Sequence, residues 1–261
     1  MKSLLRHFLN RIGRAMLTDM LDKLKRDEQI MLDEALDKLK RDEQIMLDEA
    51  LDDHDLKKEL QKISTHKTAC YIERQMSGVQ SVKSWENVHD VAIKNITIAD
   101  GLIMEFGVFY GRTINYIASK VPGIVDGFDS FEGLPESWRD GFDKGCFSVD
   151  DLPKVNSNVR LHIGWFENTI PKFIESDFNR DRMIAYLHID CDLYSSTKTI
   201  FELVGKRITK GTVIVFDEYF NYDGWEKGEF LAFMEFIESS GLSYEYLTYN
   251  SKHEQVAVFI R

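Results

Sequence analysis

From residue 64 onward, the chain alternates between short apolar runs and helical patterns. The apolar runs read as buried strands and occupy residues 101–107, 123–129, 159–164, 183–190 and 211–219. Strands that are apolar along nearly their whole length, with helices between them, predict a parallel sheet covered by helices on both faces. Residues 243–249 and 255–261 form a closing pair of strands, which predicts one antiparallel strand near an edge.

Residues 1–63 have a different pattern and form a predicted helical extension of the 64–261 domain. Fifteen residues, LDKLKRDEQIMLDEA, occupy 21–35 and recur unchanged at 36–50. The repeat is rich in Leu, Lys, Asp and Glu and lacks Gly and Pro, which predicts helix. A repeat architecture needs at least three units to bury a core. We therefore interpret the duplication as a solvated or self-associating helix without chemistry.

Residues 1–17 carry four basic side chains and no acid, and their apolar residues fall on one helical face. Such a helix suits contact with an anionic membrane surface. It suits equally a helix that packs on the protein body or on a second subunit. We favour the packing role, and with it a homo-oligomer.

Charge and cysteine content narrow the class of protein. The formal net charge of −11 argues against a nucleic-acid partner, because phosphate backbones require a basic surface. Cys70, Cys146 and Cys191 are far apart and lack CxxC spacing, which indicates reduced thiols and a cytoplasmic location. No apolar run approaches the ~20 residues that a membrane span requires.

The first candidate site follows the strand at 101–107, where the chain reads E-x-G-x-x-x-G through Glu105, Gly107 and Gly111. Ligands of open α/β sheets bind beyond the carboxyl ends of the strands, and glycine lets the backbone approach them closely. Asp129 ends the next strand, 22 residues after Gly107, where an acid commonly accepts hydrogen bonds from a ribose diol. This pairing predicts nucleoside binding, although Asp129 would also suit a turn or helix cap.

Two acid pairs end the last two strands of the parallel series: Asp190 with Asp192, and Asp217 with Glu218. Consecutive strands are usually neighbours, so four carboxylates should converge at one rim. They cannot all stay ionised there without a cation or proton uptake. Oxygen ligands suit Mg²⁺, with Mn²⁺ as a substitute. Solvated strand ends, a metal-dependent sugar-nucleotide transferase using Asp190 and Asp192, and a non-catalytic nucleoside-binding protein remain alternatives.

Three ring side chains near these motifs have uncertain roles from the sequence. His188 and His162 lie inside strands and read as buried histidines with partners, rather than as ligands. Trp165 follows the strand at 159–164, where it would lie either against a flat base or in the core.

The motifs together resemble the macrocin O-methyltransferase (TylF-like) family, over about residues 64–261. The resemblance is carried by IMEFGVFYGRTINYIA, VDGFDSFEGLPESW, GFDKGCFSVDDL, HIGWFENTIP, LHIDCDLYSSTKTIFE and VFDEYF…GWEKGEFLAFMEF, in that order. It implies a Rossmann-like class I methyltransferase sheet and an S-adenosylmethionine-dependent, metal-dependent enzyme. It also implies an acceptor that is a sugar or a glycosylated natural product.

The resemblance also implies roles for individual residues. Glu105, Gly107, Gly111, Asp129, Ser130 and Trp165 would form the cofactor pocket, with Asp129 at the ribose. Asp190, Asp217 and Glu218 would hold Mg²⁺, or Mn²⁺ in its place, and Asp192 would be the general base. The family often has Asp where Glu218 stands, and the extra methylene moves the carboxylate outward by about a bond length.

The chemistry expected of this set is methyl transfer to a hydroxyl. A bound cation lowers the pKa of a hydroxyl, and a carboxylate takes its proton. Asp190 and Asp192, two residues apart on an extended segment, would point the same way. One would then hold the metal while the other reaches the substrate. No residue identifies the acceptor, whose recognition we expect in loops such as 133–158.

Overall fold

The computed structural model describes residues 29, 31–32, 34–44, 55–176 and 178–261. Contacts divide the chain into two compact units, Met1–Glu59 and Leu60–Arg261. Residues 34–44 are helical, as predicted for that part of the repeat. The predicted amphipathic helix at 1–17 lies outside the described residues. The predicted boundary after residue 63 falls inside helix α2 and stays a prediction.

An eight-stranded sheet forms the centre of the second unit, in the order β1-β7-β8-β6-β5-β2-β3-β4. The strands are β1 (Ser81–Val82), β2 (Leu102–Phe106), β3 (Val125–Asp129), β4 (Val159–Ile163), β5 (Ile184–Ile189), β6 (Val213–Phe216), β7 (Tyr244–Asn250) and β8 (Val256–Ile260). Strand β8 runs antiparallel to both β6 and β7, while the other described pairings are parallel. This confirms the predicted mostly parallel sheet with one antiparallel strand near an edge.

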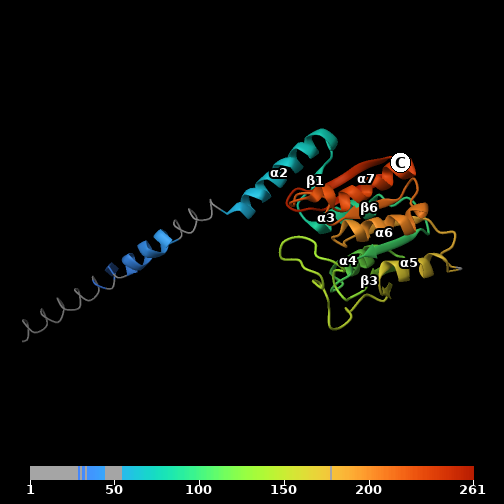
Figure 1. The fold of residues 1–261 in the computed structure, drawn as a ribbon, viewed down its shortest axis with the longest axis horizontal. Helices are drawn as coiled ribbons and strands as arrows, with labels where there is room; N and C mark the ends of the chain where they lie inside the picture. The colour runs from blue at the N-terminus through green and yellow to red at the C-terminus, as the bar shows by residue number, and fades with distance from the viewer. Residues whose placement is uncertain (1–28, 30, 33, 45–54, 177) are drawn as a thin grey trace, which may run out of the picture. The chain divides into compact units, whose positions relative to one another are not determined.

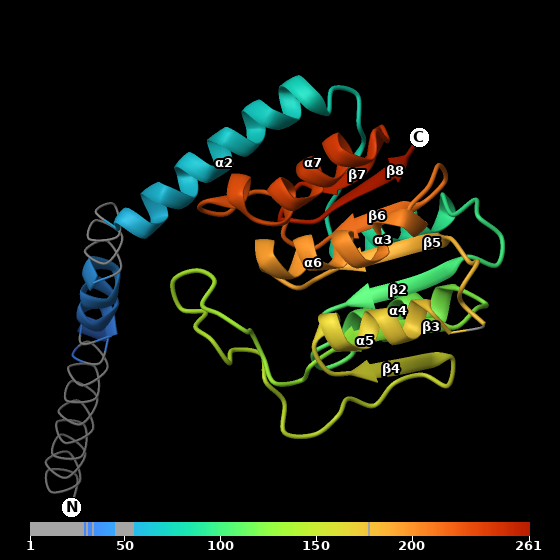
Figure 2. The ribbon, with the colours of Figure 1, turned by 45° about the vertical axis from the view of Figure 1, so that its right-hand side comes forward.

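Helices cover both faces of the sheet (Figures 1 and 2). They are α2 (Leu56–Gln75), α3 (Trp85–Lys94), α4 (Arg112–Lys120), α5 (Phe166–Ile174), α6 (Tyr194–Val204) and α7 (Glu229–Ser240), with the short 3₁₀ helices η1 (Gly205–Arg207) and η2 (Trp225–Lys227). Side chains of α3 and α4 pack on one face, and those of α5, α6 and α7 on the other. None of the described helices is long and apolar enough to cross a membrane.

The alternation of side chains along each strand assigns residues to the two cores. In β5, Leu187 and Ile189 face the α5–α7 side, whereas Tyr186 faces the α3–α4 side. His188 lies two residues after Tyr186 and therefore shares its face. The polar side chains that concern function here lie at the carboxyl ends of the central strands.

Strand β1 and helix α2 differ from the elements that the sequence predicted. Strand β1 has only two residues, too few for an alternating pattern, and pairs with β7. Helix α2 continues to Gln75, further than the predicted helical extension. Its Thr65 hydroxyl donates to the Asn221 side chain (2.9 Å), and Tyr71 and Tyr246 share a hydroxyl hydrogen bond. Tertiary contacts of this kind extend a helix beyond what its local sequence indicates.

Candidate active site

The backbone brings the predicted motifs to one rim of the sheet. Backbone hydrogen bonds between neighbouring strands continue past the strand ends. The Asp190 N–H donates to the Phe106 carbonyl (2.8 Å), and the Asp217 N–H donates to the Ile189 carbonyl (2.9 Å). Gly107 has a φ of +91°, and a Cβ added there would lie 1.6 Å from the Asp190 carbonyl oxygen. Only glycine allows the β2 turn and the β5 turn to approach this closely.

A cavity of about 480 Å³ opens at this rim. It has a volume typical of small-molecule sites. Most of the predicted site residues line it, namely Gly107, Asp129, Ser130, Trp165, Asp190, Asp192 and Glu218. Glu105, Gly111 and Asp217 do not belong to its lining. Seven of the ten predicted site residues thus line one cavity, and the roles predicted for them stay predictions.

Asp129 organises the wall of the cavity formed by the turns after β2 and β3. Its Oδ2 accepts hydrogen bonds from the N–H groups of Val108 (2.8 Å) and Phe109 (2.9 Å). Its Oδ1 accepts from the N–H of Phe131 (2.7 Å). A carboxylate offers about four acceptor positions, so capacity remains for one further donor. Asp129 thus shapes the loops in addition to any contact with a ligand.

Three other predicted cofactor residues occupy distinct places around the cavity. Trp165 is the N-cap of α5 and lines the cavity, and its predicted contact with a flat base stays a prediction. Ser130 lines the cavity, and its hydroxyl accepts from the Glu132 N–H (3.1 Å). Gly111 is the left-handed N-cap of α4 (φ +76°), and a Cβ there would lie 3.1 Å from Pro153. Gly111 therefore shapes the turn without lining the cavity.

Asp192 does not lie on an extended segment, which corrects the geometric argument made from the sequence. Its φ is +64°, and the Leu193 N–H donates to the Cys191 carbonyl (2.6 Å). This is a tight three-residue turn with Asp192 at its centre, a conformation that strains a residue other than glycine. The turn follows directly on β5, so the alternation of strand side chains no longer applies there. Asp192 nevertheless lines the cavity beside Asp190.

The acids at the rim raise one another's pKa. Burial raises the pKa of Asp190 well above its usual value, and the nearby charges of Asp217 and Asp192 raise it further. Burial, followed by the charge of Asp217, raises the pKa of Asp192 to about 7, although Arg139 opposes the shift. Burial and the same neighbouring aspartates raise the pKa of Glu218. The protein therefore does not supply enough positive charge or hydrogen-bond donors to keep all of these carboxylates ionised.

Two buried residues that the sequence did not single out fix the acid-bearing turns. Glu229, at the start of α7, is fully buried and accepts from the backbone N–H group of Glu218 (3.3 Å). Gln255 donates from Nε2 to Asp217 Oδ2 (3.1 Å). Asn250 in turn donates to Gln255 Oε1 (2.8 Å). Gln255 stands 38 residues after Asp217, so no local pattern could have identified it.

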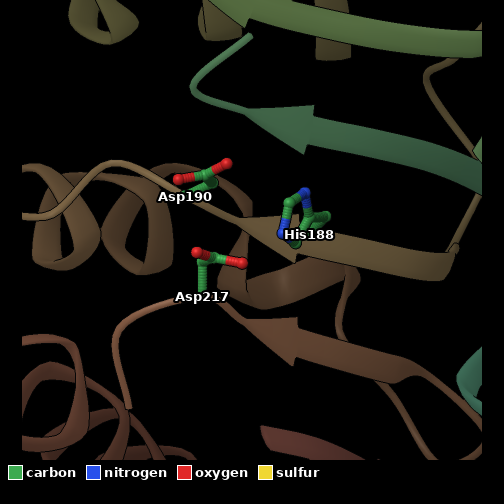
Figure 3. A group of neighbouring side chains, drawn as sticks. All are labelled: His188, Asp190 and Asp217. Carbon is green, nitrogen blue, oxygen red and sulfur yellow. The ribbon is translucent and has the colours of Figure 1, made fainter. Parts of the chain in front are cut away.

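His188 lies beside Asp190 and Asp217, and its two ring nitrogens have different surroundings. Its Nδ1 forms a 3.0 Å hydrogen bond with Glu105 Oε2, and both side chains are fully buried. Its Nε2 has no hydrogen-bond partner among the described residues. His188, Asp190 and Asp217 each offer a ligand atom within 4.8 Å of the other two (Figure 3). These atoms and the shared excess of negative charge fit a divalent cation.

The loop between β3 and β4 forms the outer part of the site. Arg139 in this loop stacks on Trp138, with 3.9 Å from guanidinium carbon to ring centroid, and pairs with Glu254 (3.3 Å). Ser195, at the start of α6, donates to Glu136 (2.6 Å). The loop is therefore tied to the β7–β8 turn and to α6, on both sides of Asp192.

Comparisons with known proteins agree with this geometry. Residues 104–219 match a family model described as a methyltransferase domain. The crystal structure of CalS11, described as a calicheamicin methyltransferase, is 23% identical with a TM-score of 0.54, over 67% of this chain and 77% of that one. The O-methyltransferase NovP is 21% identical with a TM-score of 0.49, over 67% and 76%. No curated protein matches the chain in sequence.

These findings confirm two predictions. The likeness to CalS11 confirms the Rossmann-like methyltransferase sheet. The matched family model begins within β2, ends at Tyr219 and contains both acid pairs and the Asp129 turn. Residues 104–219 therefore match a methyltransferase domain, as predicted, and the acids of the candidate site lie within the matched residues.

Proposed function

We propose that this protein is an S-adenosylmethionine-dependent O-methyltransferase that uses a divalent cation and acts on a hydroxyl of a small, sugar-containing acceptor. The observation that carries the proposal is the division of one cavity into two chemically different walls. Asp129 and Trp165 follow β3 and β4, on one side of β2, whereas Asp190 and Asp192 follow β5, on the other side of β2, and all four line the cavity. A methyl donor and a hydroxyl acceptor require this kind of two-part site.

The wall with Asp129 suits the nucleoside end of S-adenosylmethionine. Three backbone donors hold the Asp129 carboxylate in place and leave acceptor capacity for a ribose hydroxyl. Trp165 offers a flat apolar surface to a base. S-adenosylmethionine, when bound, supplies an electrophilic methyl group on its sulfonium. The residues on this wall orient the donor, and orientation alone removes a large part of the barrier to transfer.

The wall with the acids suits a cation held by Asp190 and Asp217. A divalent cation, when bound, offsets the repulsion among the carboxylates and lowers the pKa of a hydroxyl oxygen that it contacts. Glu218 lines the cavity close by, and its Oε2 has no hydrogen-bond partner among the described residues. Its predicted role as a third ligand, like the choice of Mg²⁺, stays a prediction.

Asp192 is the proposed general base. A base works best when its pKa lies near the operating pH, and the pKa of Asp192 is raised to about 7. Its strained turn, which lies between Cys191 and Leu193, presents the carboxylate to the cavity. Asp192 would hold the proton released by the acceptor while the adjacent turn keeps it at a fixed distance from Asp190.

The acceptor class is supported by the family resemblance and by the activity printed for CalS11, a calicheamicin methyltransferase. The outer loop adds aromatic side chains to the mouth of the cavity, including Phe147, which contacts both Phe109 and Phe142. Aromatic faces of this kind suit the apolar face of a sugar ring. A homo-oligomeric state and a cytoplasmic location remain predictions.

Calorimetric titration with S-adenosylhomocysteine and with a UDP-sugar, each with and without Mg²⁺, tests the proposal. We expect S-adenosylhomocysteine to bind in both conditions, because the Asp129 wall is separate from the acids. We expect the UDP-sugar not to bind, either with or without Mg²⁺, whereas a glycosyltransferase would bind it when Mg²⁺ is present. Strong Mg²⁺-dependent UDP-sugar binding without S-adenosylhomocysteine binding would favour the sugar-nucleotide transferase instead.

A further inference from the structure

We infer that helix α2 positions the outer loop at the mouth of the cavity, and that Asn221 is the positioning residue through which it acts. Asn221 belongs to the segment between β6 and α7 (residues 219–228), which contacts α2 on one side and the outer loop on the other. The inference rests on the proposed function, because the outer loop is where we expect the acceptor to be recognised.

Helix α2 binds Asn221 through its N–H, its carbonyl and its side-chain oxygen. The Gln61 amide donates to the Asn221 carbonyl (2.7 Å), and the Thr65 hydroxyl donates to Asn221 Oδ1 (2.9 Å). The Asn221 N–H donates to the Thr68 hydroxyl (3.0 Å). Residues 61, 65 and 68 are four and three positions apart, so they lie on one face of the helix. The conformation of Asn221 therefore depends on α2.

The face of α2 that makes these contacts is polar. Its buried side chains are Ser64 and Thr68. A helix that docks through hydrogen bonds is selective for the conformation of its partner, because these bonds require specific distances and angles. Asn221 has a φ of +68°, in the left-handed region that Asn enters more readily than most residues. Helix α2 thus stabilises one particular turn of the segment.

Tyr222, the next residue, connects this turn to the outer loop. Its ring is buried, and the guanidinium carbon of Arg139 lies 5.0 Å from the ring centroid. The Trp138 ring lies 5.8 Å from the same centroid. A Cβ added at Gly228 would lie 2.1 Å from the Tyr222 hydroxyl oxygen, so the end of the segment also encloses the side chain. A shift of Asn221 would therefore move Tyr222 relative to Arg139 and Trp138.

The outer loop connects Tyr222 to the cavity. The Trp138 N–H donates to the Phe142 carbonyl (2.9 Å), which closes a tight turn that contains Arg139. The ring of Phe142 stacks on that of Phe147, with 5.5 Å between centroids, and Phe147 lines the cavity. A continuous series of contacts thus joins α2 to the side of the cavity where we expect the acceptor.

Fluorine-19 NMR of the full chain labelled with 5-fluorotryptophan tests the inference. The double variant Thr65→Val/Thr68→Val keeps the branching of both side chains but removes both hydroxyls. The chain contains four tryptophans, and Trp138→Phe assigns the signal of the outer loop. We expect the Trp138 signal to shift or split in the double variant. The Trp85 signal should stay unchanged, because Trp85 begins α3, which packs on the opposite face of the sheet from Tyr71 of α2.

Two matched variants separate the hydroxyl contacts from other effects of changing α2. Thr65→Ser/Thr68→Ser retains both hydroxyls and should give the wild-type Trp138 signal. Lys67→Met removes an exposed ion pair between α2 and Glu226 (3.1 Å). Exposed pairs contribute little to stability, so this variant should also leave the Trp138 signal unchanged.

Asn221→Gly is a milder variant that tests the same contact if the double variant does not fold. Glycine adopts a positive φ without strain, so the variant removes only the side-chain oxygen that accepts from Thr65. We expect the Trp138 signal to shift in the same direction as in the double variant, but by less.

Hydrogen exchange on the same variants measures the size of the effect. We expect amides of residues 134–147 to exchange about tenfold faster in the valine double variant, because two hydrogen bonds to the supporting segment are lost. Affinity for S-adenosylhomocysteine should change by less than about threefold, because Asp129 is held by backbone groups of Val108, Phe109 and Phe131.

Two outcomes would overturn the inference and leave the proposed function in place. One is faster exchange in residues 219–224 with no change in the Trp138 signal or in residues 134–147. The other is an equal increase of exchange throughout residues 60–261, which would show that α2 contributes only to overall stability. Lack of S-adenosylhomocysteine binding by the wild type would instead contradict the proposed function, and this inference with it.

Discussion

Both walls of the cavity contain carboxylates, but the surroundings of these carboxylates differ. On the cofactor wall, the Asp129 carboxylate accepts three backbone hydrogen bonds, which hold it in place before any ligand binds. On the acidic wall, Asp190 and Glu218 face other carboxylates, and burial with those charges raises their pKa. The difference indicates that the first wall is preorganised by the protein, whereas the second is completed by a cation.

The largest expected effect comes from removing a cation ligand on the acidic wall. Asp217→Asn keeps the shape of the side chain but removes its charge, so we expect methyl transfer to fall by about 10³-fold, equivalent to about 4 kcal/mol. Cofactor affinity should change by less than about threefold, because Asp129 is untouched. Turnover and S-adenosylhomocysteine calorimetry on one preparation check this. Equal loss of both would show that the walls are not independent.

The next effect should come from the base. Asp192→Asn should lower the rate by about 10²- to 10⁴-fold, the range for a missing general base. The pKa of Asp192 is about 7 without a cation, and a bound cation lowers it, since positive charge favours the carboxylate. Because only the ionised form of Asp192 accepts a proton, the rate of the cation-loaded enzyme should rise with pH to a plateau that is reached below pH 7. The rising part of the pH–rate profile should be absent from the residual activity of Asp192→Asn, and a rise unchanged in that variant would exclude Asp192 as the base.

A smaller effect is expected on the cofactor wall. Asp129→Ala removes a charge-assisted acceptor worth about 1.5–3 kcal/mol, so affinity for S-adenosylhomocysteine should fall about ten- to hundred-fold. It also leaves the N–H groups of Val108, Phe109 and Phe131 without their acceptor. The melting temperature should therefore fall as well. Unchanged affinity together with a lower melting temperature would show that Asp129 only shapes the loops.

The acidic wall should also set the pH dependence of stability. The folded-state pKa of Asp192 is raised to about 7, so the folded state binds the proton more tightly than the unfolded chain does. The stability that this proton contributes is present at low pH and is lost as pH rises from about 4 to about 7. We expect the metal-free protein to melt a few degrees lower at pH 8 than at pH 5.5. Mn²⁺ at pH 8 should reverse the loss, and Asp192→Asn should reduce the difference in melting temperature without abolishing it, because burial also raises the pKa of Asp190 and Glu218.

The smallest effect is expected from the repeat. Deleting residues 36–50 removes about 22 Å of predicted helix and neither wall of the cavity. Cofactor binding and methyl transfer should stay near wild type, while oligomeric state is free to change. Turnover and solution mass, measured together, check this. Loss of turnover at constant mass would show that the repeat helps to build the active site.

The sequence predicted the sheet and the rim because apolar runs and strand-end acids are local signals. It did not predict the partner of His188, because Glu105 stands 83 residues earlier and meets it only through the register of β2 and β5. The sequence did contain one indication that His188 lies near the acids. His188 and Asp190 are two residues apart at the end of a strand, so their side chains lie on the same face of the sheet. The same rule failed for Asp192, because the strand had already ended.

The contact between Gly107 and the carbonyl oxygen of Asp190 has a genetic consequence. Every single-base missense change in a glycine codon introduces a side chain, and any Cβ at this position would overlap that oxygen. Position 107 therefore has no mild allele. A variant there would separate the turn after β2 from the turn after β5, and both walls of the cavity would be displaced by one substitution.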